Sequence, residues 1–314
     1  MRKMAQYDFL LLTMVFFMCL YKYVNAKTLD FILNGSIRFT QPGGFNDPFE
    51  LSLEVFNPYK NDDKSINLKF CVLKNSGEII KHLLPSDFED ENCNDLFSRL
   101  LVKRLSEEIG ILCLTKNPKS HLMWAHYADE YSGAVVEFDE SHEFFTGIFE
   151  VPYKRERPIV HMDYFINTSP IPLSDLCVKP DVWGYENEWR VIRSLVDCKN
   201  TGKKIKKHNV FTHDIPQDAI KGIILGERCS LHDARNIFNK VKNTKITLAM
   251  AALANWKYDF RFEPIKLNEP ISKMMPIISP YTAEIFVNEA GTIGEAARWM
   301  VEHHPMKNVA KWRL

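Results

Sequence analysis

The segment from Trp183 to Ile192 combines charged and aromatic side chains more sharply than any other part of the sequence. It reads Trp-Gly-Tyr-Glu-Asn-Glu-Trp-Arg-Val-Ile, which is typical of charged residues entering a strand. Because successive strand residues point to opposite faces, Glu188 and Arg190 share one face and Trp189 lies on the other. A carboxylate at the mouth of a strand can hydrogen-bond a ribose hydroxyl or orient a nucleophile. An exposed, solvated face for Glu188 and Arg190 is the alternative.

A second group of polar residues, Asn46 and Asp47, lies in a loop framed by Pro42 and Pro48. Asn and Asp in turns often bond their own backbone, which is one interpretation of this pair. The other is ligand binding, since the two prolines would hold the amide and the carboxylate in a fixed place, as a binding loop requires.

The segment 121–129 predicts a short helix that carries Trp124 and Tyr127 on one face. Stacked aromatic side chains can hold a planar ring. The same residues suit a hydrophobic core, and composition does not separate these two interpretations. His121 and His126 lie in this helix five residues apart and therefore point to different faces, so we expect no metal site there.

Two runs of basic residues could bind phosphate groups. The first runs from Lys199 to His208 between two strand-like segments, and the second comprises Lys154, Arg155 and Arg157. Solvated hairpin tips are the alternative. The sequence lacks the Gly-rich dinucleotide fingerprint, the P-loop, the HExxH zinc motif and the GxSxG elbow, which argues against the corresponding enzyme classes.

The elements that must position these residues alternate between short strand-like runs and a few helical ones, which predicts an α+β or α/β fold. Apolar residues recur with helical periodicity over 27–35, 94–109, 230–241 and 292–303. Strand patterns cover 37–40, 110–115, 133–139, 188–193, 220–225, 245–248 and 258–265.

The overall composition is that of an ordinary globular protein. Residues of the hydrophobic class make up 46% of the chain and charged residues 25%, which excludes disordered, collagenous and coiled-coil classes. Forty basic residues balance forty acidic ones, so any anionic partner must be met by a local patch. The seven cysteines are scattered singly, which favours a reducing compartment. We therefore expect a cytoplasmic protein with no membrane partner.

The N-terminus has the layout of a signal peptide, with Arg2 and Lys3 before an apolar run over 9–20 and a small residue at Ala26. Cleavage after Ala26 would remove a strand-like segment at 20–23. Met14 and Met18 are alternative starts. We predict an apolar extension over 1–19, a main domain over 20–268, and a helical tail over 269–314 after a change to proline-rich sequence.

Four segments in this order resemble the bacterial domain-of-unknown-function family 2971, over roughly residues 20–227. They are Leu20-Tyr21-Lys22-Tyr23, Phe39-Thr40-Gln41-Pro42 running into Phe45-Asn46-Asp47-Pro48-Phe49-Glu50, Met123-Trp124-Ala125-His126-Tyr127-Ala128 with Gly133, and Tyr185-Glu186-Asn187-Glu188-Trp189-Arg190. The second and third are specific motifs, whereas the first is weak alone. The family name supplies no function.

The arrangement is also distantly similar to ADP-ribosyltransferase domains of bacterial toxins. Those domains have an opening strand with a ribose-contacting residue, a helix of the pattern LxxILxxG, and a catalytic glutamate at the start of a late strand. Segments 21–23, 29–35 and 188–192 take these places. The opening strand has Lys22 between tyrosines where the superfamily often has histidine or arginine. The resemblance implies an α+β fold with a split β-sheet core and flanking helices.

The resemblance further implies cleavage of the nicotinamide glycosidic bond of NAD, with Glu188 stabilising the oxocarbenium-like ribose and no catalytic metal. It also implies residues that bind NAD. Trp124 or Tyr127 would stack on the nicotinamide, and Asn46 and Asp47 would contact the ribose or the adenine. Lys22, Arg38 or Arg190 would neutralise the pyrophosphate, with Tyr21 and Tyr23 beside Lys22.

The acceptor of ADP-ribose is implied to be a nucleic acid, a protein or water, and the basic run favours nucleic acid bound by Lys203, Lys204, Lys206 and Lys207. Such a toxin or antiviral effector needs an inhibitory antitoxin or a chaperone. Two other functions stay open: an NAD glycohydrolase on the same fold, and a non-catalytic module that binds nucleotide or nucleic acid.

Overall fold

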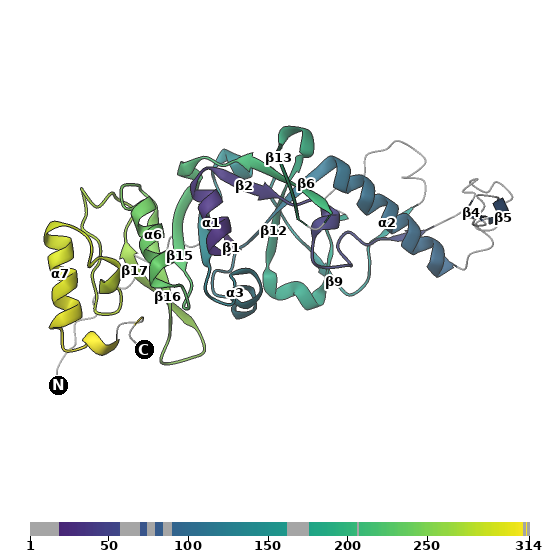
Figure 1. Cartoon of the computed structure of the whole chain (residues 1–314). Coiled ribbons are helices and arrows are strands. Elements are labelled where there is room, and N and C mark those ends of the chain that lie inside the picture. The colour runs from purple at the N-terminus through teal and green to yellow at the C-terminus, as the bar shows by residue number, and fades with distance from the viewer. Residues whose placement is uncertain are drawn as a thin grey trace.

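The structure, a computed structural model, describes residues 19–56, 70–73, 79–83, 90–161, 176–205, 207–309 and 312. It is a mixed α+β structure built on a large mixed sheet with several helices (Figure 1). The principal helices are α1 (Ala26–Leu33), α2 (Asp90–Glu108), α3 (His121–Tyr127), α6 (Leu231–Val241) and α7 (Gly291–Glu302).

Eight strands form the central sheet in the order β17-β16-β15-β7-β1-β6-β12-β8. All neighbours pair antiparallel except β15 and β16, which are parallel. Their bounds are β1 (Cys19–Val24), β6 (Ile109–Thr115), β7 (Ala134–Asp139), β8 (Phe149–Glu150), β12 (Glu188–Ser194), β15 (Ile220–Leu225), β16 (Thr247–Leu253) and β17 (Phe260–Lys266).

The sheet is nearly divided between β1 and β6. Strand β1 pairs with β7 along its whole length, from Cys19 opposite Asp139 to Val24 opposite Ala134. With β6, in contrast, it shares only the pair Tyr21 and Thr115. Beyond this pair the two strands separate, and we call the gap between them the seam. The seam splits the sheet into a β17–β1 half and a β6–β8 half.

Helices cover both faces of the β17–β1 half. The side chains of Leu20 and Val24 on β1 pack in the main core with Leu29 of α1 and Phe238 of α6. Tyr21 and Tyr23 alternate with them and pack on the other face with Met123 and Trp124 of α3. Caps define where these helices begin: Asn25 accepts the N–H of Thr28, Ser120 that of Met123, and Ser230 that of Asp233.

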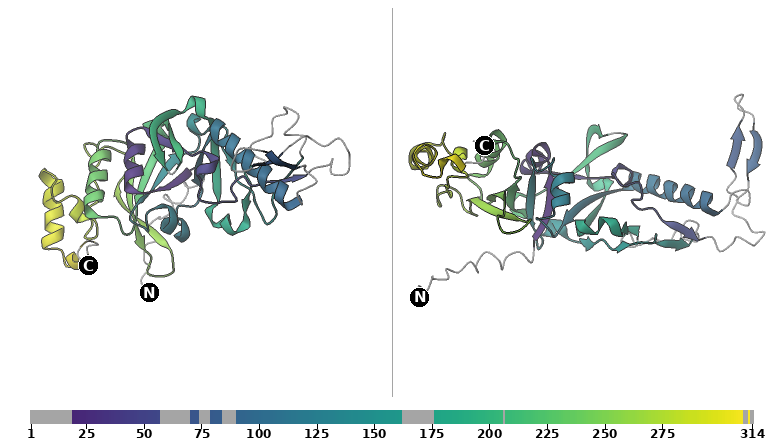
Figure 2. Two further views of the ribbon diagram at one scale, coloured as in Figure 1. Left: turned by 45° about the vertical axis from the view of Figure 1, so that its right-hand side comes forward. Right: turned by 90° about the horizontal axis from the view of Figure 1, so that it is seen from below.

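A smaller sheet, in the order β13-β14-β2, lies beside the main one. It consists of β2 (Ser36–Phe39), β13 (Lys199–Ile205) and β14 (His208–Asp214). The β13–β14 hairpin projects from the body of the molecule (Figure 2). Shorter elements are β3 (Glu54–Phe56), β4 (Phe70–Leu73), β5 (Ile79–Leu83), β9 (Tyr153–Lys154), β10 (Ile159–His161), β11 (Lys179–Pro180) and the 3-10 helices η3 (Pro42–Gly44) and η6 (Asp181–Glu186).

The helices and strands predicted from periodicity are present, with three differences. The strand predicted over 245–248 corresponds to β16, which runs from Thr247 to Leu253. The predicted helix 94–109 begins at Asp90, four residues earlier. The basic run from Lys199 was predicted as a connection between strands, but its residues 199–205 themselves form β13. Residues 269–314 include α7, and Trp312 donates its indole N–H to the Cys229 carbonyl on the main body (3.1 Å).

The predicted N-terminal apolar extension lies almost wholly outside the described residues, which begin at Cys19. Its last residue, Cys19, opens β1 and is buried, so the first strand begins one residue before the predicted main domain. Within the ranges that the structure describes, no helix combines the length and apolarity required to cross a bilayer.

We expect Gly133→Ala to destabilise the fold. A Cβ at Gly133 would lie 2.1 Å from the backbone oxygen of Val24, so β1 or β7 must shift to admit it. Such overpacking costs about 1–3 kcal/mol in the free energy of unfolding, measured by urea denaturation. The control is Gly184→Ala, where a Cβ meets no atom within 4 Å. Equal stability of the two variants would contradict this account of the β1–β7 packing.

Candidate functional site

A cavity of about 190 Å³ opens at the seam. Both halves of the sheet contribute to its wall, together with α3 and the loop that follows β2 (Figure 1). Its lining residues are Tyr21, Lys22, Tyr23, Thr40, Phe45, Asn46, Glu50, Ile111, Cys113, Leu114, Met123, Tyr127, Lys179, Glu186 and Glu188. Carboxylates, ammonium groups and phenols therefore meet in one small space.

Arg190 forms the buried base of this site. Its guanidinium has no exposed surface and lies between two carboxylates. Nε donates to Glu188 Oε1 at 2.8 Å and Nη2 to Glu188 Oε2 at 3.2 Å, while Nη1 donates to Glu50 Oε1 at 2.6 Å. This charge-assisted fork fixes the orientation of the Glu188 carboxylate.

Lys179 joins Glu188 to a third carboxylate. Its Nζ donates to Glu188 Oε2 at 3.0 Å and also forms a short ion pair with Glu186. The other oxygen of Glu186 accepts the phenol O–H of Tyr127 at 2.6 Å. Tyr127 belongs to α3, so this bond crosses from the β6–β8 half of the site to the opposite wall. We call Glu50, Lys179, Glu186, Glu188 and Arg190 the ion cluster.

Local backbone structure explains why Glu186 and Glu188 converge on one lysine. Asn187 between them ends η6 in the left-handed region (φ 43°), which Asn tolerates better than most residues. The Glu188 N–H then donates to the phenol oxygen of Tyr153 (2.8 Å), and Thr115 Oγ1 donates to the Glu186 carbonyl (2.6 Å). Strand β9 pairs with β11, which places Lys179 beside Tyr153.

The charges of the ion cluster do not cancel. Three carboxylates face two cations, leaving one formal negative charge in a buried setting. Burial would raise the pKa of Glu188, but Arg190 and Lys179 outweigh it and lower that pKa to about 2. Burial also raises the pKa of Glu186, and here Lys179 only partly opposes it. Glu188 is thus held as an anion, whereas Glu186 accepts a proton more readily.

Two further cations, Lys22 and Arg38, lie near the cavity. Lys22 Nζ donates to the Cys113 carbonyl across the seam at 3.0 Å. The Arg38 Nε–H is buried without a hydrogen-bond partner. Burial lowers the pKa of both side chains. For Lys22 the charge of Glu188 opposes this shift, and repulsion from Arg38 adds to it. Among the described residues, neither has a carboxylate at ion-pair distance, so together they could hold an anionic ligand.

The structure brings together most of the residues that the sequence singled out for catalysis and NAD binding. Six of them line the cavity, and they are Tyr21, Lys22, Tyr23, Asn46, Tyr127 and Glu188. The alternative of a solvated face for Glu188 and Arg190 is wrong, because Glu188 is 4% exposed and Arg190 fully buried. The predicted contact of Arg190 with pyrophosphate is also wrong, since its guanidinium is occupied by Glu50 and Glu188.

Trp124 and Asp47 are the other two corrections. Trp124 is fully buried, donates to the Pro118 carbonyl and packs edge-on against Tyr23, so it offers no face to a nicotinamide ring. Asp47 lies outside the cavity lining, and its Oδ1 accepts the N–H of Phe49 at 2.9 Å, as in an ordinary Asx turn.

The four lysines predicted to bind nucleic acid do not line the cavity where the structure describes them. Lys203, Lys204 and Lys207 are exposed on the β13–β14 hairpin, and Lys206 falls outside the described residues. The second basic run, over 154–157, begins in β9 next to the site.

Sequence reasoning missed Lys179, Glu186 and Glu50 as members of the site. Glu186 and Glu50 lie inside the segments 183–192 and 45–50 discussed above, so a search for paired carboxylates could have found them. Lys179 belongs to a two-residue strand with no periodicity, and no local signal marks it.

Comparison with known proteins adds no family to this geometry. No family model matches the chain, and neither a curated protein nor a solved structure is significantly similar to it. Within the described ranges, no three His, Cys, Asp or Glu side chains are grouped as ligands for a metal ion. The site is therefore interpreted from its own residues.

We expect the ion cluster to make stability depend on pH in acid. The folded-state pKa of Glu188 is about 2 against 4.5 for an unperturbed glutamate. Between these values the unfolded chain binds the extra proton, so this contribution is present above pH 4.5 and is lost as the pH falls towards 2.

The measurement is urea denaturation of the wild type and of Glu188→Gln between pH 2.5 and 5. The slope of unfolding free energy against pH should decrease by up to about 1.4 kcal/mol per pH unit in the variant. Glu107→Gln, at an exposed position of α2, should keep the wild-type slope. An unchanged slope in Glu188→Gln would refute the assignment of an ionised, paired Glu188.

Proposed function

We propose that this chain is an NAD-dependent ADP-ribosyltransferase that cleaves the nicotinamide–ribose bond at the seam. In this proposal the divided sheet is the split β-sheet core of that fold, and Glu188, at the start of β12, is the carboxylate beside the ribose. The observation that carries the proposal is the negatively charged ion cluster with Glu188 ionised at the wall of the cavity.

A negative site suits this chemistry because departure of nicotinamide leaves positive charge on the ribose. A fixed carboxylate stabilises such an oxocarbenium-like centre more strongly than the neutral-ring ground state of the sugar. Arg190 and Glu50 behind Glu188 hold the carboxylate in place, so it needs no reorganisation during the reaction.

The dimensions of the cavity limit which part of NAD it holds. Cavities that enclose whole ligands usually measure about 300–1,000 Å³, and this one measures about 190 Å³. It therefore suits the nicotinamide-ribose end, with Tyr127 and Phe45 as aromatic walls. The diphosphate would lie against Lys22 and Arg38, and the buried Nε–H of Arg38 has no hydrogen-bond partner in the described part of the chain.

Glu186 is the group best suited to receive a proton from the acceptor. Its pKa is raised by burial, and its carboxylate lies on the same lysine as that of Glu188. The incoming nucleophile, a hydroxyl or an amine, would lose its proton to Glu186 as its bond to the ribose carbon forms and nicotinamide leaves. Under this proposal the chain is a cytoplasmic effector, related to family 2971, that an inhibitory partner holds in check.

We expect purified protein to release nicotinamide from NAD and to lose this activity in Glu188→Gln. Loss of a preorganised charge that acts on the transition state lowers turnover by about 10²–10³-fold. Nicotinamide is measured by chromatography with RNA, DNA and protein supplied separately as acceptors. Free ADP-ribose without any modified acceptor would identify a glycohydrolase instead.

The matched control is Glu137→Gln. Glu137 is also a strand glutamate with a pKa raised by burial, but it lies on β7 outside the cavity lining. It should therefore keep nearly full turnover. The proposal fails if no acceptor supports NAD consumption, or if Glu188→Gln and Glu137→Gln are equally active.

We also expect Arg38→Gln to weaken the binding of NAD more than it slows the reaction. A charge-assisted hydrogen bond to phosphate contributes about 1.5–3 kcal/mol, which corresponds to roughly 10–100-fold in KM for NAD. Steady-state kinetics separates KM from kcat. A variant with unchanged KM would place the diphosphate elsewhere.

A further inference from the structure

The β13–β14 hairpin is the most basic element of the described chain. Residues 199–214 contain five lysines against one aspartate, although basic and acidic residues balance over the whole sequence. Every described residue of β13 is exposed, and the hairpin stands out from the body of the molecule (Figure 2). Its positive side chains are therefore exposed to solvent together on one part of the surface.

In the described part of the chain no carboxylate neutralises these lysines, in contrast to several other surface lysines. Lys221, Lys240 and Lys257 pair with Asp139, Asp30 and Asp259, respectively. Among the residues that the structure describes, no carboxylate lies at ion-pair distance from Lys199, Lys203, Lys204 or Lys207. Like charges held together in this way destabilise the fold slightly and attract a polyanion.

An exposed aromatic ring accompanies the lysines. Phe31 of α1 is 47% exposed although it is apolar, and Lys203 Nζ lies 5.8 Å from the centre of its ring. Neighbouring residues of the same helix, Leu29 and Ile32, are buried. A ring beside unpaired ammonium groups offers one surface for a base and several for phosphates, which is the combination used to bind single-stranded nucleic acid.

The hairpin also leads to the cavity. His208, at its turn, packs so closely on the loop after β2 that a Cβ on Gly43 would lie 2.9 Å from the imidazole. The same loop continues to Phe45 and Asn46, which line the cavity. A strand bound along the hairpin can thus follow this loop to the site.

We propose that the β13–β14 hairpin and Phe31 bind single-stranded nucleic acid and present it to the cavity as the acceptor. Binding itself is independent of the proposed NAD chemistry, whereas the acceptor role rests on it. A single strand is favoured over a duplex because only an unpaired base can place its face on Phe31. An acidic protein would meet the lysines but leaves the aromatic ring without a planar partner.

The test measures fluorescence anisotropy of labelled 20-nucleotide oligouridylate, oligodeoxythymidylate and a duplex with the full chain and no NAD. Lys203→Glu/Lys204→Glu/Lys207→Glu should weaken single-strand binding by at least tenfold. It should also reduce the slope of log affinity against log salt by about 2, as three lost phosphate contacts predict. Phe31→Ala should weaken binding about 5–100-fold with the slope unchanged, since it removes stacking alone.

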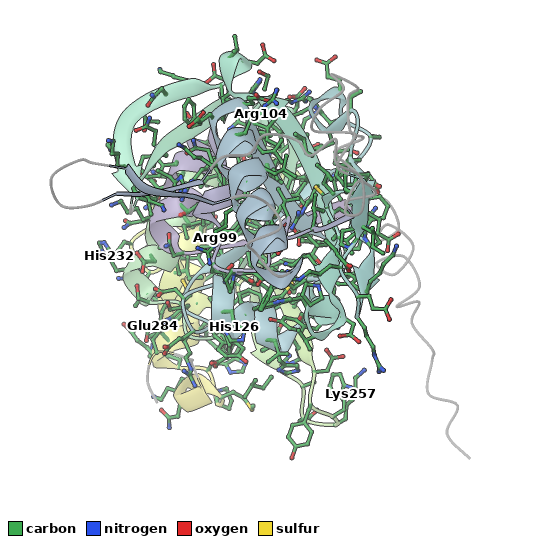
Figure 3. All side chains as sticks on the ribbon, turned by 90° about the vertical axis from the view of Figure 1, so that its right-hand side faces the viewer. Arg99, Arg104, His126, His232, Lys257 and Glu284 are labelled. Carbon is green, nitrogen blue, oxygen red and sulfur yellow. The ribbon has the colours of Figure 1, made fainter. Side chains whose placement is uncertain are left out.

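The matched control, Lys245→Glu/Lys257→Glu/Lys273→Glu, changes the net charge equally on exposed lysines outside the hairpin. Lys257 lies at the bottom of the view in Figure 3, whereas the β13–β14 hairpin lies at the top in Figure 1, which has the same vertical axis. The proposal is overturned if the control variant loses as much affinity as the hairpin variant, if the duplex binds as tightly as the single strands, or if polyglutamate competes as well as unlabelled oligouridylate.

Failure of the nucleic-acid proposal can be told apart from failure of the proposed chemistry. NAD hydrolysis without acceptor should be unchanged in the hairpin variant, because none of the substituted lysines lines the cavity. Binding of oligonucleotide without any NAD consumption would refute the enzyme and keep the hairpin. NAD consumption without binding of oligonucleotide would refute the nucleic-acid proposal and leave the proposed enzyme activity standing.

Discussion

The burial of Arg190 is the constraint on which the site depends. Removing a guanidinium from water costs several kcal/mol, so the fold can hold it only where carboxylates surround it. Glu188 supplies one partner from the same strand, and Glu50 supplies the other from a loop 140 residues earlier. The loop after β2 must therefore close onto β12, and this closure completes one wall of the cavity.

The seam follows from the same arrangement. Strand β6 pairs fully with β12, which brings Cys113 and Thr115 to the ion cluster. Strand β1 pairs fully with β7 instead, and the two sets of strands meet only at Tyr21 and Thr115. Along the seam, Lys22 donates to the Cys113 carbonyl of β6, and Thr40 pairs with Ile111 further along the same strand.

Many of the helices and strands that form the site could be predicted from the sequence, because local patterns of residues reflect local structure. Alternation identified β12 and placed Glu188 and Arg190 on one face of it, and caps and periodicity located α1 and α6. The long-range contacts carried no such signal. Trp124 and Tyr127 share a helical face, but their surroundings differ. Trp124 packs against Tyr23 and Phe260 in the core, whereas Tyr127 lines the cavity. β13 was missed as a strand because lysine disfavours strands, and pairing with β14 outweighs that preference.

The single pair of residues that joins the two halves of the sheet also governs how the molecule opens. The cooperative units of a protein follow its contacts, and few backbone hydrogen bonds cross from β1 to β6. The amides of β1 and β7 should exchange with solvent as one group, and those of β6 and β12 as another. A ligand bound across the seam would contact both groups of strands. Its binding free energy would therefore stabilise the two halves of the sheet against opening separately.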